Sequence, residues 1–357
     1  MNLEVIKVDA SKKKPIPTDE SKLGFGQMFS DHMFMMEYDA GKGWHSARIE
    51  PYHSLELDPA AMVLHYGQEA FEGLKAYRGK DDGVYLFRYQ DNLGRLNNSC
   101  DRLVMPNIDI PFVSEALKKL VLLDQDWIPK SPGTSLYIRP NIVAVDPFVG
   151  VRPSNRYFFY IIVGPVGAYY PEGFNPVSIF VSDKYVRAVV GGIGASKTAG
   201  NYAASLLAQM EAKEKGFTQV LWLDAKERKY IEEVGTMNIF FKFGDEVVTS
   251  PLTGSILPGI TRDSVIKLLD KWGVKVSERL FSIDDVVAAQ KDGSLKEVFG
   301  TGTAAIISPV GTIHYKGTDY PVADQKTGEL SQKLYDYLLG LQYGQEEDTF
   351  GWVEKIG

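Results

Sequence analysis

The sequence is poor in cysteine: Cys100 is the single one among 357 residues. No disulfide can form within the chain, so nothing points to an oxidising compartment. The N-terminus lacks the apolar stretch of a signal peptide and the arginine-rich character of a transit peptide. The most apolar stretch, residues 157–170, contains a proline and two glycines and is too short to span a membrane. These absences predict a soluble cytoplasmic protein without a membrane partner.

The chain also lacks an excess of positive charge. It has 39 Lys and Arg against 46 Asp and Glu, a net charge of −7, with both signs interspersed. Nucleic-acid binding requires a basic face, so no nucleic-acid partner is expected. The five histidines are scattered, and none forms a pair with ligand spacing, so no metal site is predicted. A hydrophobic content of 44% and a charged content of 24% are typical of a globular enzyme.

The length predicts two domains, because a single hydrophobic core rarely serves more than roughly 250–300 residues. Two prolines and a glycine within residues 169–176 indicate a linker. We therefore expect a smaller α+β domain over residues 1–168 and a larger α/β domain over residues 177–357. The polar residues 1–20, rich in lysine and proline, are expected to form a loose arm.

The periodicity of apolar residues predicts the main elements. Strands are expected over residues 33–38, 47–51, 71–77, 83–88, 135–140, 156–163, 177–181, 219–223 and 246–249. Helices are expected over residues 62–70, 90–105, 113–125, 201–215, 262–271, 283–290 and 331–341.

Lys197 is the most informative residue. It is a lone cation among about a dozen small or apolar residues, from Val189 to Tyr202. Burial in such a setting lowers the pKa of an ammonium group, and a neutral amine is a nucleophile. Such an amine can form a Schiff base with a carbonyl substrate or with pyridoxal phosphate (PLP). The alternative is an ordinary surface lysine on a glycine-rich loop.

Three segments suit an anion such as a phosphate. Thr261 follows a Pro-Gly turn and is a fitting N-cap for the helix after it, where free N–H groups bind anions. The alternating glycines and threonines of Gly300–Thr303 can bring backbone amides together, although a tight turn explains them equally well. Arg95 lies on a mostly apolar helix and could either form a structural ion pair or bind a phosphate.

Two adjacent glutamates precede a glycine turn. Alternation along a strand places Glu232 and Glu233 on opposite faces. We expect Glu232 to be solvated and Glu233 to face a pyridine ring nitrogen, keeping it protonated.

These segments, in this order, resemble the branched-chain amino acid aminotransferases of aminotransferase class IV. The resemblance runs from about Gly24 to Gly344. The motifs that carry it are Leu64–Tyr66, Phe71–Ala76, Tyr137–Pro140, Gly164–Tyr169, Lys197–Tyr202, Glu233–Asn238, Leu257–Arg262 and Gly300–Ala304. It implies the two-domain fold type IV of PLP enzymes, which is similar to D-amino acid aminotransferase, with the PLP lysine in the larger domain.

The resemblance also implies a role for each matching residue. Lys197 would hold PLP and act as the catalytic proton shuttle. The other cofactor-binding residues would be Tyr202 at the phenolic oxygen, Glu233 at the ring nitrogen, and Arg95, Ile260, Thr261 and Thr303 at the phosphate. The substrate-binding residues would be Thr236 and Ala304 at the carboxylate, Phe25, Tyr66, Phe71, Tyr137 and Tyr169 around the side chain, and Arg139 at the distal carboxylate of glutamate.

The implied reaction is the reversible, ping-pong transfer of an amino group from leucine, isoleucine or valine to 2-oxoglutarate, giving glutamate. The implied assembly is a homodimer in which Tyr66 reaches the neighbouring active site. A D-amino acid aminotransferase or an aminodeoxychorismate lyase on the same fold is the alternative. The chain departs from the human-type enzymes at Ala305 and Ser308, where those enzymes have a redox-sensitive Cys-x-x-Cys motif, so that thiol switch is expected to be absent.

Overall fold

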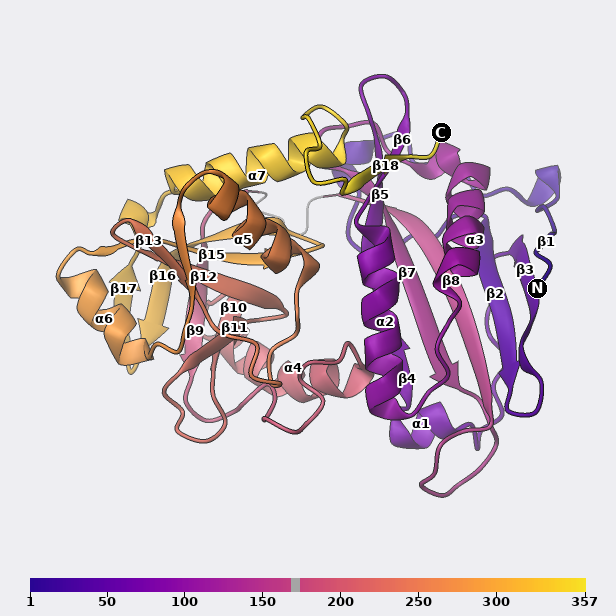
Figure 1. The fold of residues 1–357 in the computed structure, drawn as a ribbon, viewed down its shortest axis with the longest axis horizontal. Helices are drawn as coiled ribbons and strands as arrows, with labels where there is room; N and C mark the ends of the chain where they lie inside the picture. The colour runs from indigo at the N-terminus through magenta and orange to yellow at the C-terminus, as the bar shows by residue number, and fades with distance from the viewer. Residues whose placement is uncertain (168–173) are drawn as a thin grey trace. The chain divides into compact units, whose positions relative to one another are not determined.

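The computed structural model describes residues 1–167 and 174–357, and it divides into two compact units (Figure 1). Unit 1 consists of Met1–Tyr169, Ser196–Ala199 and Leu339–Gly357, and unit 2 of Tyr170–Ala195 and Gly200–Leu338. The segment around Lys197 is therefore grouped with unit 1. The expected linker lies partly outside the described residues, and the domain boundaries stay a prediction.

Unit 1 is built on a nine-stranded sheet in the order β1-β3-β2-β8-β7-β5-β6-β18, with β4 paired to β7. Adjacent strands are antiparallel except β1 and β3, which are parallel. The strands are β1 (Glu4–Val5), β2 (His32–Asp39), β3 (Gly43–Pro51), β4 (Glu69–Phe71), β5 (Leu74–Arg78), β6 (Val84–Phe87), β7 (Ser135–Ala144), β8 (Arg156–Val166) and β18 (Val353–Lys355).

Two helices, α2 (Tyr89–Leu103) and α3 (Ile110–Leu123), pack together against this sheet (Figure 1). Their apolar residues, such as Leu96 and Leu117, share one buried core with strand residues such as Phe159. The short helix α1 (Met62–Tyr66) ends at Gly67, whose φ of 58° is left-handed. The predicted helix over residues 62–70 is therefore too long.

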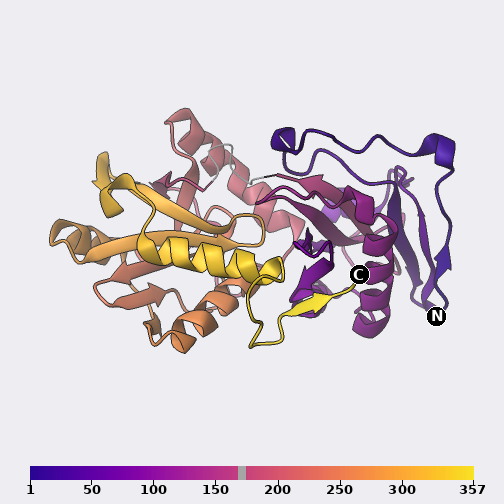
Figure 2. The same cartoon turned by 90° about the horizontal axis from the view of Figure 1, so that it is seen from above.

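The N-terminal segment is docked, so the prediction of a loose arm over residues 1–20 is wrong (Figure 2). Its strand β1 extends the sheet. The backbone N–H of Val8 donates to His32 Nε2 at 2.9 Å. The Glu20 carboxylate accepts from the backbone N–H of Ser131 at 2.6 Å. The polar composition of residues 1–20 did not predict this docking, because backbone pairing along a sheet edge does not require apolar side chains.

Unit 2 contains a second nine-stranded sheet, in the order β11-β10-β9-β16-β15-β12-β13-β14, with β17 paired to β16. An additional pairing of β11 with β12 closes the strands β11, β10, β9, β16, β15 and β12 into a ring. The strands are β9 (Val177–Ser182), β10 (Gln219–Leu223), β11 (Ile231–Val234), β12 (Met237–Phe243), β13 (Glu246–Thr249), β14 (Lys275–Glu278), β15 (Leu295–Gly302), β16 (Ile306–Tyr315) and β17 (Thr318–Pro321).

The helices of unit 2 lie around this sheet (Figure 1). In α4 (Ala199–Glu214), Ala208 and Ala212 pack on Val220 and Trp222 of β10. The helices are α4 (Ala199–Glu214), α5 (Ile260–Lys271), α6 (Ile283–Lys291) and α7 (Glu329–Gln342), of which α4 begins and α7 ends in unit 1. Single-turn 3₁₀ helices lie at Ala10–Lys12, Glu20–Lys22, Gln125–Trp127 and Ala323–Gln325.

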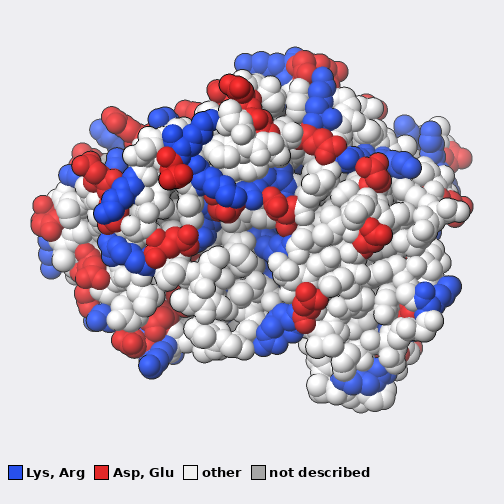
Figure 3. Space-filling view, in the orientation of Figure 1, with Lys and Arg blue, Asp and Glu red and all other residues white. Residues whose placement is uncertain are grey.

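The surface carries both signs of charge. On the face seen in Figure 3, each unit carries both basic and acidic side chains. Within the described residues, no helix is long and apolar enough to cross a lipid bilayer.

Candidate active site

The backbone of Lys197 is hydrogen-bonded on both sides. Its N–H donates to Ser99 Oγ on α2 at 2.9 Å, and its carbonyl accepts from the N–H of Phe71 on β4 at 3.1 Å. The next residue, Thr198, donates its hydroxyl to the carbonyl of Glu69 at 2.6 Å. Within unit 1, Lys197 is thus fixed to α2 and β4, and it is half-buried, as its apolar neighbours predicted.

Arg95 forms an ion pair with a fully buried carboxylate, Glu72. Arg95 Nε donates to Glu72 Oε1 at 2.7 Å and Arg95 Nη2 to Oε2 at 2.9 Å. Asn92 Nδ2 donates to the same Oε2 at 2.9 Å. Burial raises the pKa of Glu72, but Arg95, together with the charge of Lys197, outweighs it and leaves the pKa lowered. The structure agrees with both roles that the sequence allowed for Arg95, a structural ion pair and a phosphate ligand, because an ion-paired arginine can still bind a phosphate.

Four of the predicted substrate-binding side chains lie together in unit 1. Arg139 Nη2 donates to the Tyr137 hydroxyl at 3.0 Å, and the Phe25 ring meets the Tyr137 ring edge-on at 4.8 Å between centroids. The Phe71 ring has the Arg139 guanidinium 4.8 Å from its centroid and Lys197 Nζ also at 4.8 Å. Phe71 therefore joins the candidate nucleophile to the aromatic cluster.

Tyr66 and Tyr169 are not part of that cluster as described. Tyr66, on α1, is 39% exposed. Tyr169 lies outside the described residues.

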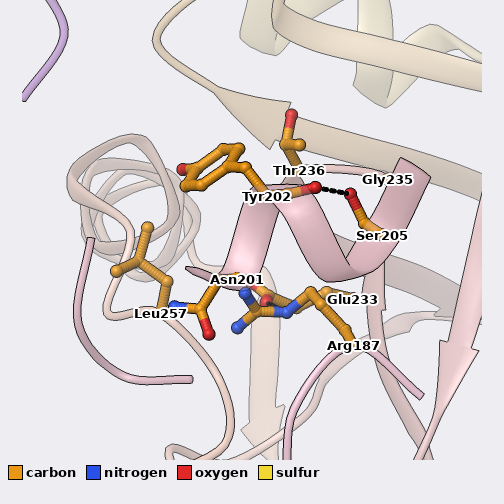
Figure 4. Close-up of a pocket in the computed structure, with 8 residues that line it drawn as sticks. All are labelled: Arg187, Asn201, Tyr202, Ser205, Glu233, Gly235, Thr236 and Leu257. Carbon is orange, nitrogen blue, oxygen red and sulfur yellow. Dashed lines mark hydrogen bonds and ion pairs between the residues drawn. The ribbon is translucent and has the colours of Figure 1, made fainter. Parts of the chain in front are cut away.

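Unit 2 contains a pocket that opens to solvent (Figure 4). Its lining includes three of the predicted residues, Tyr202, Glu233 and Thr236. The other lining residues are Arg187, Asn201, Ser205, Gly235 and Leu257. Tyr202 and Asn201 come from the start of α4, and Glu233 from β11 just before the turn that carries Thr236.

Glu233 is held by two partners. Its carboxylate forms an ion pair with Arg187 and accepts from Asn238 Nδ2 at 2.9 Å. Asn238 Nδ2 also donates to the carbonyl of Leu257 at 2.9 Å. A Cβ at Gly259 would lie 2.0 Å from Asn238 Oδ1, so only glycine permits this approach. Asn238 therefore fixes Glu233 relative to the segment that begins α5.

Glu232 is not solvated, so that prediction is wrong. Its side chain is buried, and Glu232 Oε1 accepts from the Ser255 hydroxyl at 2.5 Å. Burial raises the pKa of Glu232 in spite of Ser255 and nearby Arg187. Alternation places the two glutamates on opposite faces, but in a strand of a closed ring both faces are covered.

Thr261 is not an N-cap, which corrects the prediction. The helix α5 begins at Ile260 after the N-cap Gly259, which has no side chain to cap it, and Thr261 is the buried second residue of the helix. A helix start without a side-chain cap still suits an anion. Thr303 and Ala304 lie in the turn that joins β15 to β16.

Comparison with known proteins identifies the family. Residues 69–313 match the family described as Amino-transferase class IV, which is more than half of the chain. The chain belongs to the class IV aminotransferases. The aminotransferase predicted from the motifs is therefore confirmed.

Relatives of this aminotransferase agree with the match. The chain is 57% identical over 357 residues to branched-chain-amino-acid aminotransferase 2 of Bacillus subtilis, covering 100% of this chain and 98% of the relative. It is 54% identical over 346 residues to branched-chain-amino-acid transaminase 1 of the same organism, covering 97% and 96%. The predicted resemblance to this group is confirmed.

Solved structures confirm the predicted fold type. The crystal structure of the Escherichia coli branched-chain amino acid aminotransferase has a TM-score of 0.76 at 29% identity, covering 92% of this chain and 99% of that one. The branched-chain amino acid aminotransferase from Thermobaculum terrenum, in its PLP form, also has a TM-score of 0.76, at 22% identity, covering 93% and 100%. At that lower identity, the second structure supports the fold alone.

Class IV aminotransferases depend on PLP, and the side chains of this chain suit that cofactor. Glu233 is a buried carboxylate on the lining of a pocket, where it suits a protonated ring nitrogen. Tyr202 brings a phenol to the same pocket. Lys197 supplies a half-buried amine, and the start of α5 suits a phosphate. The individual roles of these residues stay predictions.

Sequence reasoning missed several residues of the site. Arg187 carried no signal, because an isolated arginine in a loop does not reveal its partner. Ser99 and Glu72 lie 98 and 125 positions before Lys197 in the chain. Glu72 did offer a sign, because it follows Phe71 and precedes Gly73 and Leu74, and a glutamate buried in such a segment requires a partner.

Proposed function

We propose that this aminotransferase uses PLP to exchange the amino group between branched-chain L-amino acids and 2-oxoglutarate. The observation that carries the proposal is the buried carboxylate of Glu233 in a pocket shared with Tyr202, in a chain 57% identical over its length to a branched-chain-amino-acid aminotransferase. When bound, PLP supplies an electron-accepting ring that stabilises negative charge at the substrate Cα.

The cofactor is held at its ring and at its phosphate. Glu233 keeps a proton on the ring nitrogen, because Arg187 and Asn238 hold its carboxylate in place. Tyr202 donates to the phenolic oxygen. The phosphate is bound by the Arg95 guanidinium, by the backbone N–H of Ile260 at the start of α5, and by the hydroxyls of Thr261 and Thr303; of these, Arg95 carries the charge.

Lys197 does the proton chemistry. Its Nζ would hold the cofactor and would carry a proton between the substrate Cα and the cofactor C4′. General acid–base catalysis of this kind contributes about 10²–10⁴-fold. The fixed backbone of Lys197 restricts the positions that Nζ can reach, which favours transfer between these two atoms.

The predicted substrate-binding residues suit two kinds of substrate side chain. Thr236 and the backbone of Ala304 bind the α-carboxylate. Aromatic rings such as Phe25 and Phe71 contact an aliphatic side chain, and Arg139 binds the distal carboxylate of glutamate. An apolar pocket separates substrates that differ by one methylene by only about 1–3 kcal/mol. Leucine, isoleucine and valine are therefore all expected to react.

The functional assembly is a homodimer. The exposed face of α4 carries Leu206, Leu207 and Met210, which are 58%, 56% and 61% exposed. Neighbouring exposed apolar residues on one helix are typical of an interaction surface, and a second copy of this chain is the partner that the family suggests. Tyr66 would reach the partner's site. The mass in solution measures this directly, and the cytoplasmic location stays a prediction.

The decisive experiment is the absorbance of the purified, PLP-loaded protein. We expect a visible band that L-leucine removes and 2-oxoglutarate restores. In the variant Lys197→Ala, the band and the turnover should both be lost. A Lys197→Ala protein with near-normal turnover would refute the assignment.

The same experiment tests the alternative. D-leucine is the matched control, and it should leave the band unchanged. A band that responds to D-leucine and not to L-leucine would favour a D-amino acid aminotransferase. Release of pyruvate from aminodeoxychorismate would favour the lyase.

A further inference from the structure

Ser99 connects the candidate phosphate arginine to the candidate catalytic lysine. It lies four residues after Arg95 on α2, so the two residues share a face of the helix. Ser99 Oγ donates to the carbonyl of Arg95 at 3.1 Å and accepts from the N–H of Lys197 at 2.9 Å. Ser99 is 1% exposed, so water cannot readily replace its hydroxyl. One hydroxyl thus ties the backbone of Lys197 to the helix that carries Arg95.

Glu72 fixes the other end of this arrangement, the Arg95 side chain. Both of its carboxylate oxygens accept from the guanidinium, and Asn92 Nδ2 and the backbone N–H of Gly73 also donate to Oε2, at 2.9 and 3.1 Å. Glu72 is 0% exposed, and burying a charged carboxylate lowers the stability of the fold unless the group is fully paired. The pairing uses the Nε edge of the guanidinium, so the plane and the direction of the group are set before any phosphate binds.

We propose that Ser99 and Glu72 are positioning residues of the aminotransferase. Ser99 places the backbone of Lys197, and Glu72 sets the orientation of the Arg95 guanidinium. The proposal rests on the proposed function, in which Lys197 bonds the cofactor and Arg95 binds its phosphate. Because β4 holds the carbonyl of Lys197 while Ser99 holds its N–H, loss of either contact should allow the lysine to shift.

The two residues should have separable effects. Pyridoxal has the aldehyde of PLP but no phosphate. Loss of Glu72 should therefore weaken the binding of PLP while leaving the binding of pyridoxal nearly unchanged. Loss of Ser99 should weaken both in parallel, because both ligands bond Lys197. A general loss of structure cannot weaken the binding of PLP while leaving the binding of pyridoxal unchanged.

The experiment measures the affinity of the full-length apoprotein for PLP and for pyridoxal, by equilibrium dialysis, in Glu72→Gln and Ser99→Ala. Two matched controls carry the same changes elsewhere. Glu297→Gln alters a buried carboxylate that accepts from the N–H groups of Leu330 and Ser331. Ser114→Ala alters a buried serine of α3 whose hydroxyl has no hydrogen-bond partner among the described residues.

We expect Glu72→Gln to lower the affinity for PLP at least about tenfold and that for pyridoxal less than about twofold, on the scale of one charge-assisted hydrogen bond. Ser99→Ala should lower both affinities by a similar factor and reduce kcat by about tenfold to a hundredfold, as a displaced reacting group does. It should also shift the pH midpoint of the visible absorbance. Both controls should keep the wild-type ratio of the two affinities.

Equal losses for the two ligands in Glu72→Gln, or none, would overturn the role of Glu72. An unchanged kcat and pH midpoint in Ser99→Ala would overturn the role of Ser99. If Glu72→Gln does not fold, Glu72→Asp, which keeps the charge, serves the same comparison. A wild-type protein that binds neither ligand would refute the proposed function instead, so the two failures are distinguishable.

Discussion

The two units bury glutamates under opposite conditions. In unit 1, Glu72 accepts hydrogen bonds from Arg95 and Asn92, and its pKa is lowered although it is fully buried. In unit 2, Glu232 accepts from Ser255, one of its oxygens has no hydrogen-bond partner among the described residues, and burial raises its pKa. The contrast shows that the donors and charges around a buried carboxylate, and not burial alone, determine the direction in which its pKa shifts.

Glu233 differs from its neighbour Glu232 in its partners. The two are adjacent on β11, yet Glu233 has both an arginine and an asparagine as partners. Under the proposed function, these partners hold the Glu233 carboxylate where it can accept a hydrogen bond from a protonated ring nitrogen. Glu232 is not among the residues that line this pocket.

The largest expected effect is on kcat, and it tests whether Glu233 and Glu232 differ in function. Glu233→Gln removes the charge proposed to face the ring nitrogen, and kcat should fall by about a hundredfold or more, the scale of one lost electrostatic contact in an active site. Glu232→Gln should change kcat less than about threefold. Steady-state kinetics with leucine measures both. Similar losses in the two variants would contradict the assignment of Glu233.

The next effect concerns the stability of the two units. Glu72→Gln leaves Arg95 buried without its counter-charge, which should lower the free energy of unfolding by about 3–5 kcal/mol at neutral pH. Glu232→Gln keeps an acceptor for Ser255 and removes a poorly solvated charge, so it should be neutral or stabilising. Denaturant titration followed by circular dichroism measures both changes. A destabilised Glu232→Gln variant would mean that its charge is paired after all.

The pH dependence should sharpen the contrast, because the two shifts have opposite signs. The lowered pKa of Glu72 contributes stability above the ordinary value of 4.5 and loses it as the pH falls through the folded-state value. The raised pKa of Glu232 has no cost below 4.5, and its cost grows as the pH rises through the folded-state value. The deficit of Glu72→Gln should therefore shrink in acid, and any gain of Glu232→Gln should appear towards neutral pH. Thermal unfolding between about pH 2 and pH 8, which covers both windows, provides the test, and parallel profiles would contradict it.

The smallest effect concerns the thiol in the core of unit 1. Cys100 is fully buried on α2, and burial raises its pKa to about 12. The native protein should therefore resist thiol reagents at pH 8, whereas the unfolded chain should react once. Mass spectrometry after labelling counts the adducts. Rapid labelling of the native protein would show that α2, which also carries Arg95 and Ser99, opens readily.

Local pattern predicted much of the fold. The helix expected over residues 90–105 is α2, and the strand expected over residues 219–223 is β10. By contrast, β12, with its buried apolar run from Ile239 to Phe241, was not predicted as a strand. A strand covered on both faces shows no alternation, so the period of two that reveals a half-buried strand is absent.

The sequence by itself determined which residues could do chemistry. A lone amine among small and apolar residues, a glutamate before a glycine turn and an arginine in a predicted helix were visible as candidates. Only the tertiary structure decided what holds them: Ser99 against Lys197, Glu72 against Arg95, and Arg187 against Glu233. The physical reason is that the type of a side chain is a local property. Its partner, in contrast, comes from a distant part of the chain and is chosen by sheet pairing and helix packing, which no short window of sequence contains.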